Sequence, residues 1–200
     1  AELLATAWPA AAATAPQASA GDLTRYTRER GLAVMPVRGL LTPNSELLER
    51  YLGWATYRGI TEACAELAAD EAVAAVVVEF DTPGGYTLGI GDAVTALRDL
   101  AAVKPVHALA APLAASAGYW LASQARELVM TPGAAVGSIG VAVTAAANVA
   151  PGAASGVQLF DFTSRHARAK WPDPATEDGK AEIRRGLDQT EARFHAAVAE

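Results

Sequence analysis

The chain has 200 residues, of which 52% are apolar, and a formal net charge of -6 with a pI near 5.1. This length and apolar content suffice to bury a substantial core, and one domain is the default expectation. The arginines are scattered without a basic patch, which argues against nucleic acid as a partner. The single cysteine, Cys64, cannot form an internal disulfide, and we interpret it as a small buried side chain.

The first twenty residues are rich in alanine and end in a pattern like a signal-peptide cleavage site. However, Glu2 stands where a signal peptide has basic residues, and two prolines interrupt the segment. We therefore expect residues 1–30 to form an arm that is mobile or packs in an oligomer. Residues 31–200 are expected to form a single domain.

Two uncharged windows, residues 105–125 and 128–160, are long enough for membrane spans. Both contain Pro, Gly and Ser, which suits a buried core better than a helix in lipid. We expect a soluble, cytoplasmic protein, bacterial or associated with a phage prohead, with membrane association as the less favoured alternative.

The first predicted elements are a strand over residues 32–39 and a helical pattern over residues 46–71. Asn44 or Ser45 is expected to cap the helical pattern. Gly53 and Gly59 are expected to break that pattern into two helices.

The middle of the chain alternates between strand and helix patterns. Residues 73–80 form an apolar, β-branched run, which is typical of a strand buried on both faces of a parallel sheet. A helix over residues 88–102 follows, and then a strand that begins at Val106, a short helix from Ser116 and a strand from Glu127. This alternation predicts right-handed βαβ crossovers and the α/β class.

After a tight turn at GSIGV, we expect a strand over residues 156–162 and a polar loop over residues 164–174. Asp173 is expected to cap the final helix, with Pro174 in its first turn. Its buried stripe is predicted to consist of Ile183, Leu187, Phe194 and Val198.

The residues that are candidates for chemistry lie in the turns after the middle strands. Ser116 would stand at a helix N-terminus, where free N–H groups and the macrodipole favour negative charge. Gly84 and Gly85 follow a buried strand, and glycine lets backbone N–H groups approach a substrate carbonyl. The alternative is an ordinary capping serine and an ordinary turn.

A serine nucleophile needs a base, and the chain has three histidines. His107 lies within an apolar strand pattern, where a structural role is favoured, and His195 is expected to be solvated on the last helix. His166, in the polar loop, remains a candidate.

Lysine is the alternative base, because burial lowers the pKa of an ammonium group. Lys104 and Lys180 are expected to be solvated. Lys170 is followed by Trp171 and Pro172, whose apolar side chains offer such burial.

Three motifs, FDTPGG, LAASAGYWLAS and TPGAAVGSIGV, occur in this order. They resemble the signal peptide peptidase A family of serine peptidases (S49), in particular its short phage members that act as head maturation proteases. The resemblance extends from about Leu32 to the final helix. It implies an α/β fold of the ClpP/crotonase type, a spiral of ββα units with a C-terminal helix, and a Ser-Lys dyad.

Carried over position by position, the resemblance implies that Ser116 is the nucleophile. The amides of Gly85 and Ala117 would form the oxyanion hole, with Gly84 beside them. Lys170, the only lysine in the loop that matches the family's dyad loop, would be the base.

The chain departs from the family pattern at three positions. Many members have Ser in place of Thr82 and Gly in place of Ala117, and both changes leave the backbone donors available. Family loops often place the lysine directly after a histidine, and Ala167 occupies that position here.

The sequence therefore predicts a serine endopeptidase that forms an acyl-enzyme on Ser116 and needs no metal or organic cofactor. Its expected partners are a polypeptide substrate, a phage-type capsid or scaffold protein, and further copies of itself in a homo-oligomer. The alternatives are a peptidase that degrades signal peptides, a crotonase-type enzyme acting on acyl-CoA thioesters, and an inactive assembly scaffold.

Overall fold

The computed structural model describes residues 24–142 and 172–199. The predicted strand over residues 156–162, His166 and Lys170 lie outside the described residues, as does most of the predicted arm. The chain divides into two compact units, one within Ala1–Ile139 and Ala197–Glu200 and one within Gly140–Ala196. The predicted division into an arm and a single domain stays a prediction.

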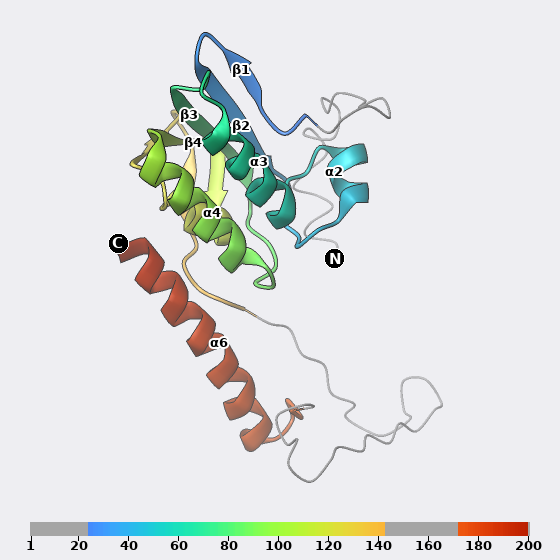
Figure 1. The fold of residues 1–200 in the computed structure, drawn as a ribbon. Helices are drawn as coiled ribbons and strands as arrows, with labels where there is room; N and C mark the ends of the chain where they lie inside the picture. The colour runs from blue at the N-terminus through green and yellow to red at the C-terminus, as the bar shows by residue number, and fades with distance from the viewer. Residues whose placement is uncertain (1–23, 143–171, 200) are drawn as a thin grey trace. The chain divides into compact units, whose positions relative to one another are not determined.

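The described strands of the first unit form one sheet (Figure 1). They are β1 (Thr27–Glu29), β2 (Leu32–Arg38), β3 (Ala75–Thr82), β4 (Val106–Ala115), β5 (Glu127–Met130) and β6 (Ala135–Gly137). Their order is β1-β2-β3-β4-β5, and β6 also pairs with β4. All pairings are parallel except that of β1 with β2. The predicted α/β class is confirmed, and the arrangement is consistent with a ClpP/crotonase-like fold.

Two of these strands, β1 and β6, were not predicted from the sequence. Each has three residues, and β1 is exposed at all of them while β6 is exposed at two. Such short strands carry no apolar alternation, so the periodicity that reveals longer strands is absent. β1 falls within the range that the sequence assigns to the arm.

The described helices are α2 (Glu46–Leu52), α3 (Tyr57–Ala69), α4 (Ile90–Val103), α5 (Ala117–Ala122) and α6 (Glu177–Ala199). Helices α3 and α4 lie side by side against one face of the sheet (Figure 1). Residues of β3 accordingly alternate between buried and half-buried, so the prediction that both faces are fully buried is wrong. No helix within the described ranges combines the length and apolar content that a membrane crossing needs.

The predicted break at Gly53 is confirmed, whereas the predicted break at Gly59 is wrong. Gly53 ends α2 with a φ of 64°. Gly59 lies inside α3 and donates its N–H to the hydroxyl of Thr56 at 2.9 Å, which caps the helix. A Cβ at position 59 would lie 2.2 Å from Oε1 of Glu49. This glycine therefore allows close packing and does not interrupt the helix.

The predicted C-terminal helix is confirmed as α6, but its cap differs from the prediction. The hydroxyl of Thr176 accepts the N–H of Gly179 at 3.0 Å, while Asp173 accepts the N–H of Ala175 in the preceding turn. Thr176 is thus the capping side chain, and Asp173 stabilises the turn that leads into the helix. Of the predicted stripe, Phe194 is buried and the other three residues are half-buried.

Lys104 is not solvated as expected, because it binds the C-terminal end of α3. Its Nζ donates to the carbonyl oxygens of Leu67 at 2.5 Å and of Asp70 at 2.6 Å. A cation at this end of a helix satisfies free carbonyl groups and interacts favourably with the macrodipole.

We therefore expect Lys104→Met to lower the free energy of unfolding by about 1–3 kcal/mol, the cost of leaving such carbonyls without a charged donor. Urea unfolding followed by circular dichroism measures this change. Lys180→Met is the control, because the Nζ of Lys180 pairs, among the described residues, only with Glu177 on the surface of α6. Equal losses in the two variants would contradict the structural role of Lys104.

Candidate active site

The register between β3 and β4 brings the two predicted motif turns together. Phe80 pairs with Ala110, but Thr82 pairs with Ala114, so β4 advances four residues where β3 advances two. Two residues beyond the pair of Thr82 and Ala114, counted along both strands, Gly84 lies beside Ser116. Without the two extra residues in β4, the register of Phe80 would place Gly84 beside Ala114 instead. The irregularity in β4 thus decides which residue faces the glycine turn.

The backbone of Gly84 lies directly against Ser116. A Cβ at position 84 would lie 2.7 Å from the Cβ of Ser116 and 2.9 Å from the amide nitrogen of Ala117. Gly84 also has a φ of 101°, which side chains of L-residues rarely allow. Space and backbone conformation therefore both require glycine here.

The turn is tied on its other side to the segment after β2. The N–H of Leu41 donates to the carbonyl of Gly84 at 2.9 Å, and the N–H of Tyr86 donates to the carbonyl of Leu41 at 3.0 Å. A Cβ at Gly85 would lie 2.0 Å from the carbonyl oxygen of Leu41. These two hydrogen bonds therefore hold the backbone of Gly85 close to the backbone of Leu41.

Ser116 itself has an unusual backbone conformation, with a φ of 52° and a ψ of -122°. Its N–H donates to the carbonyl of Gly137 at 2.8 Å, and its carbonyl accepts the N–H of Trp120 at 2.9 Å. Its side chain is half-buried and caps no N–H of α5. A positive φ at a non-glycine residue costs on the order of 1–3 kcal/mol and is typical of functional turns. The alternative of an ordinary capping serine is therefore not supported.

The backbone N–H groups near Ser116 differ in whether they already donate a hydrogen bond within the protein. The N–H of Gly84 donates to the hydroxyl of Thr82 at 3.0 Å. The N–H groups of Gly85 and Ala117 have no hydrogen-bond acceptor within the described ranges. Thr82, which the sequence marked only as a departure from the family pattern, thus contacts the turn directly. Its second bond, to the carbonyl of Gly39, joins segments far apart in the sequence and could not be predicted from the motif alone.

Two of the candidate bases lie at the opposite end of β4 from Ser116. His107 lies about 23 Å along the sheet from Ser116, because its partner Val77 precedes Gly84 by seven residues of β3 and its turn, and its Nδ1 lies 2.7 Å from Oε1 of Glu127 on β5. Lys104 precedes the strand and binds the end of α3. Neither can reach the hydroxyl of Ser116, and the preference for a structural His107 agrees with its pairing. His195 is exposed on α6.

Two other ionisable groups of the first unit also lie outside this arrangement. Cys64 is 2% exposed, and burial raises the pKa of its thiol to about 12, so it stays protonated at neutral pH. Burial also raises the pKa of Asp81, an effect that Arg38 opposes. Asp81 precedes Thr82 on β3, so its side chain points to the other face of the sheet.

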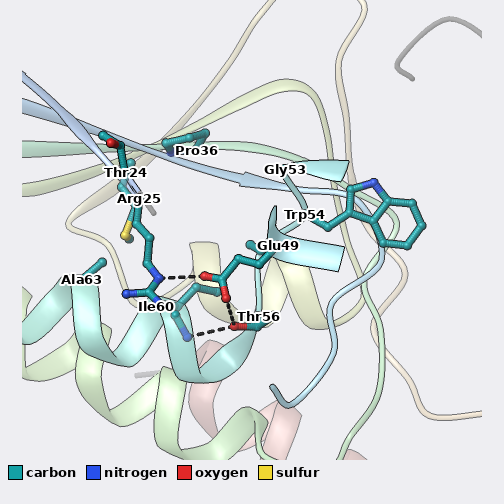
Figure 2. Close-up of a pocket in the computed structure, with 12 residues that line it drawn as sticks. Thr24, Arg25, Pro36, Glu49, Gly53, Trp54, Thr56, Ile60 and Ala63 are labelled. Atoms are coloured by element: carbon teal, nitrogen blue, oxygen red, sulfur yellow. Dashed lines mark hydrogen bonds and ion pairs between the residues drawn. The ribbon is translucent and has the colours of Figure 1, made fainter. Parts of the chain in front are cut away.

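A separate pocket lies between β2, α2 and α3 (Figure 2). Glu49, which is 8% exposed, accepts from Nε of Arg25 at 2.7 Å and from the hydroxyl of Thr56 at 3.3 Å. These polar groups satisfy one another, which is how a buried carboxylate is accommodated. None of the predicted site residues that the structure describes lines this pocket, and we interpret it as structural.

The close approach of Gly84 to Ser116 leads to a stability prediction. Gly84→Ala should lower the free energy of unfolding by about 1–3 kcal/mol, because the added Cβ meets Ser116 and adopts a disfavoured φ. Gly91→Ala is the matched control, since a Cβ there meets nothing within 4 Å and the residue lies in α4. That variant should be neutral or slightly more stable. Urea unfolding of both variants measures the difference, and a Gly84→Ala protein as stable as Gly91→Ala would contradict the contact.

The chain is similar to two phage proteins. It is 38% identical to the capsid assembly protease C of Escherichia phage lambda over 116 residues, which are 58% of this chain and 26% of that protein. It is 34% identical to the head-tail preconnector protein GP5 of Enterobacteria phage P21, again over 116 residues, 58% of this chain and 23% of that protein. The chain thus spans about a quarter of the length of the curated relatives it matches.

Among solved structures, an enoyl-CoA hydratase from Mycobacterium avium subsp. paratuberculosis is similar with a TM-score of 0.45 and 19% identity. That similarity covers 58% of this chain and 51% of the other. The model of peptidase family S49 matches residues 98–200, which is just over half of the chain and includes Ser116, α5 and α6. The chain therefore belongs to peptidase family S49.

Proposed function

We propose that this chain is the catalytic domain of a serine endopeptidase in which Ser116 attacks the carbonyl carbon of a peptide bond. The observation that carries the proposal is the contact of the Gly84 turn with Ser116, which stands at a positive φ. Membership of a peptidase family supports the same reaction. A half-buried serine hydroxyl beside two N–H groups that have no acceptor among the described residues is an arrangement suited to acyl transfer.

The reaction would proceed in two halves. Lys170, neutral in the resting enzyme, takes the proton of the Ser116 hydroxyl as the oxygen attacks, and it returns that proton to the leaving amine. The resulting acyl-enzyme is hydrolysed by a water molecule, whose proton Lys170 accepts and then gives to Oγ of Ser116 as the carboxylic acid product leaves. The N–H groups of Gly85 and Ala117 would hold the negative oxygen of each tetrahedral intermediate, an effect of about 3 kcal/mol per donor.

Gly84 has a different role in this proposal. Because its N–H already donates to Thr82, the donors are Gly85 and Ala117. Gly84 contributes by lacking a side chain, so that the turn approaches Ser116 closely.

Lys170 is favoured as the base because Lys104 and His107 are engaged at the far end of β4. The family resemblance also assigns the base to the loop that contains Lys170. The lysine would act within its own subunit or on a neighbouring subunit of a homo-oligomer, and His166 in the same loop is the alternative base.

For the substrate, the two phage relatives indicate proteins of a phage-type particle. One is named a capsid assembly protease and the other a head-tail preconnector. We therefore propose that the chain cleaves capsid or scaffold proteins in association with a prohead.

A crotonase-type enzyme is the second candidate, because paired N–H groups would also stabilise the enolate of an acyl-CoA thioester. A crotonase-type reaction would give Ser116 and Lys170 no shared role. An inactive assembly scaffold is the third candidate, and it requires neither residue.

Labelling of the purified full chain with a fluorophosphonate probe, followed by intact mass, separates these candidates. We expect one adduct on the parent protein and none on Ser116→Ala. Lys170→Ala and Lys170→Arg should each slow labelling by at least ~100-fold, because arginine keeps its proton and cannot act as a base. His166→Ala is the control and should label at the parental rate.

Other outcomes would contradict parts of this proposal. Labelling that survives in both lysine variants but is lost in His166→Ala would make His166 the base. A folded parent protein that takes up no probe would instead favour the acyl-CoA enzyme or the scaffold.

A further inference from the structure

We propose that Thr82 is a positioning residue of the oxyanion hole: its hydroxyl fixes the turn that carries the Gly85 donor, and its methyl group packs against Gly118, next to the Ala117 donor. Its effect on catalysis rests on the function proposed above. Its contacts with the two turns are independent of that function.

The hydroxyl of Thr82 holds the glycine turn. The side chain is fully buried at the end of β3, with 0% exposure. Oγ1 donates to the carbonyl of Gly39 at 2.6 Å and accepts the N–H of Gly84 at 3.0 Å. The hydroxyl has a single hydrogen, which the shorter bond to Gly39 uses. The group thereby links the end of β2 to the turn and fixes the peptide immediately before the N–H of Gly85.

The methyl group of Thr82 packs against the other donor-bearing segment. A Cβ at Gly118 would lie 2.4 Å from Cγ2 of Thr82, so the methyl group occupies the space above this glycine. Gly118 is the second residue of α5 and directly follows Ala117. One side chain therefore contacts the residue next to each donor, Gly84 on one side and Gly118 on the other.

The bond from Gly84 to Thr82 also determines which amide remains available. Because Thr82 accepts the N–H of Gly84, the next donor along the turn that has no acceptor among the described residues is Gly85. Removal of the hydroxyl would leave buried N–H and C=O groups without partners, and the turn would move to satisfy them. Catalysis depends steeply on donor position, since a misplacement of about 1 Å can cost ~100-fold in rate.

Three variants separate the two contacts. Thr82→Val keeps the shape and removes the hydroxyl, whereas Thr82→Ser keeps the hydroxyl and removes the methyl group. The matched control is Thr56→Val. Thr56 is also 0% exposed and also accepts a backbone N–H, that of Gly59, while donating to another group, but it does so in the cap of α3.

The first measurement is the rate of fluorophosphonate labelling, normalised to the folded fraction from urea unfolding. We expect Thr82→Val to slow labelling by at least ~10-fold. Thr82→Ser should stay within about threefold of the parent, because it retains the hydrogen bonds that hold the Gly84 turn. Thr56→Val should lose stability but label at the parental rate. Should the valine variant not fold, Thr82→Ala removes the same hydroxyl without a branched side chain.

The second measurement, hydrogen exchange by mass spectrometry, does not depend on activity. Thr82→Val should speed amide exchange in the peptide that covers residues 83–86, and Thr56→Val should not. If the parent takes up no probe but this difference in exchange is found, the proposed function fails and the hold of Thr82 on the turn stands. Unchanged exchange in Thr82→Val would overturn the inference, as would parental labelling of its folded fraction or an equal rate loss in Thr56→Val.

Discussion

The close approach of Gly84 to Ser116 is the contact on which the rest of the site depends. It exists because β3 and β4 are parallel neighbours whose following turns meet at one edge of the sheet. It also requires the two additional residues within β4, since these bring Ser116 level with the glycine. The pairing of two strands thus sets the distance between the proposed nucleophile and its proposed donors. The absence of a side chain at position 84 then lets the two backbones touch.

Around this contact the structure combines strain with support. Ser116 holds a backbone conformation that is unfavourable for a residue with a side chain, and the carbonyl of Gly137 on β6 keeps it there through one short bond. The hydroxyl of Thr82 holds the opposing turn by accepting the N–H of Gly84. Small residues at Gly84 and Gly118 leave space that Ser116 and Thr82 fill. The proposed catalytic geometry therefore depends on four segments together: the end of β3, the Gly84 turn, the Ser116 turn and β6. None of them alone would maintain it.

Strands β2 to β4 and helices α3 and α4 could be predicted because each buries a face, and burial imposes a period of two or of 3.6 residues on the sequence. Strand β5 is exposed at three of its four residues, and only its apolar run over residues 128–130 revealed it. Strands β1 and β6 are too short and too exposed to show such a period. Gly59 was misread because a glycine that breaks a helix and one that allows packing against Glu49 look alike in sequence. Ser116 and the glycine turn could be predicted from motifs after strands. The role of Thr82 could not, because its contacts with Gly39 and Gly118 join segments that lie far apart in the sequence.

The most direct test of this account is a crystal structure of the full chain after reaction with the fluorophosphonate. We predict a phosphorus atom bonded to Oγ of Ser116, with its oxygen about 2.7–3.1 Å from the amide nitrogens of Gly85 and Ala117. The N–H of Gly84 should still donate to Thr82. An adduct on another residue, or a phosphonyl oxygen that contacts neither amide, would contradict the central claim that these two turns form one catalytic site.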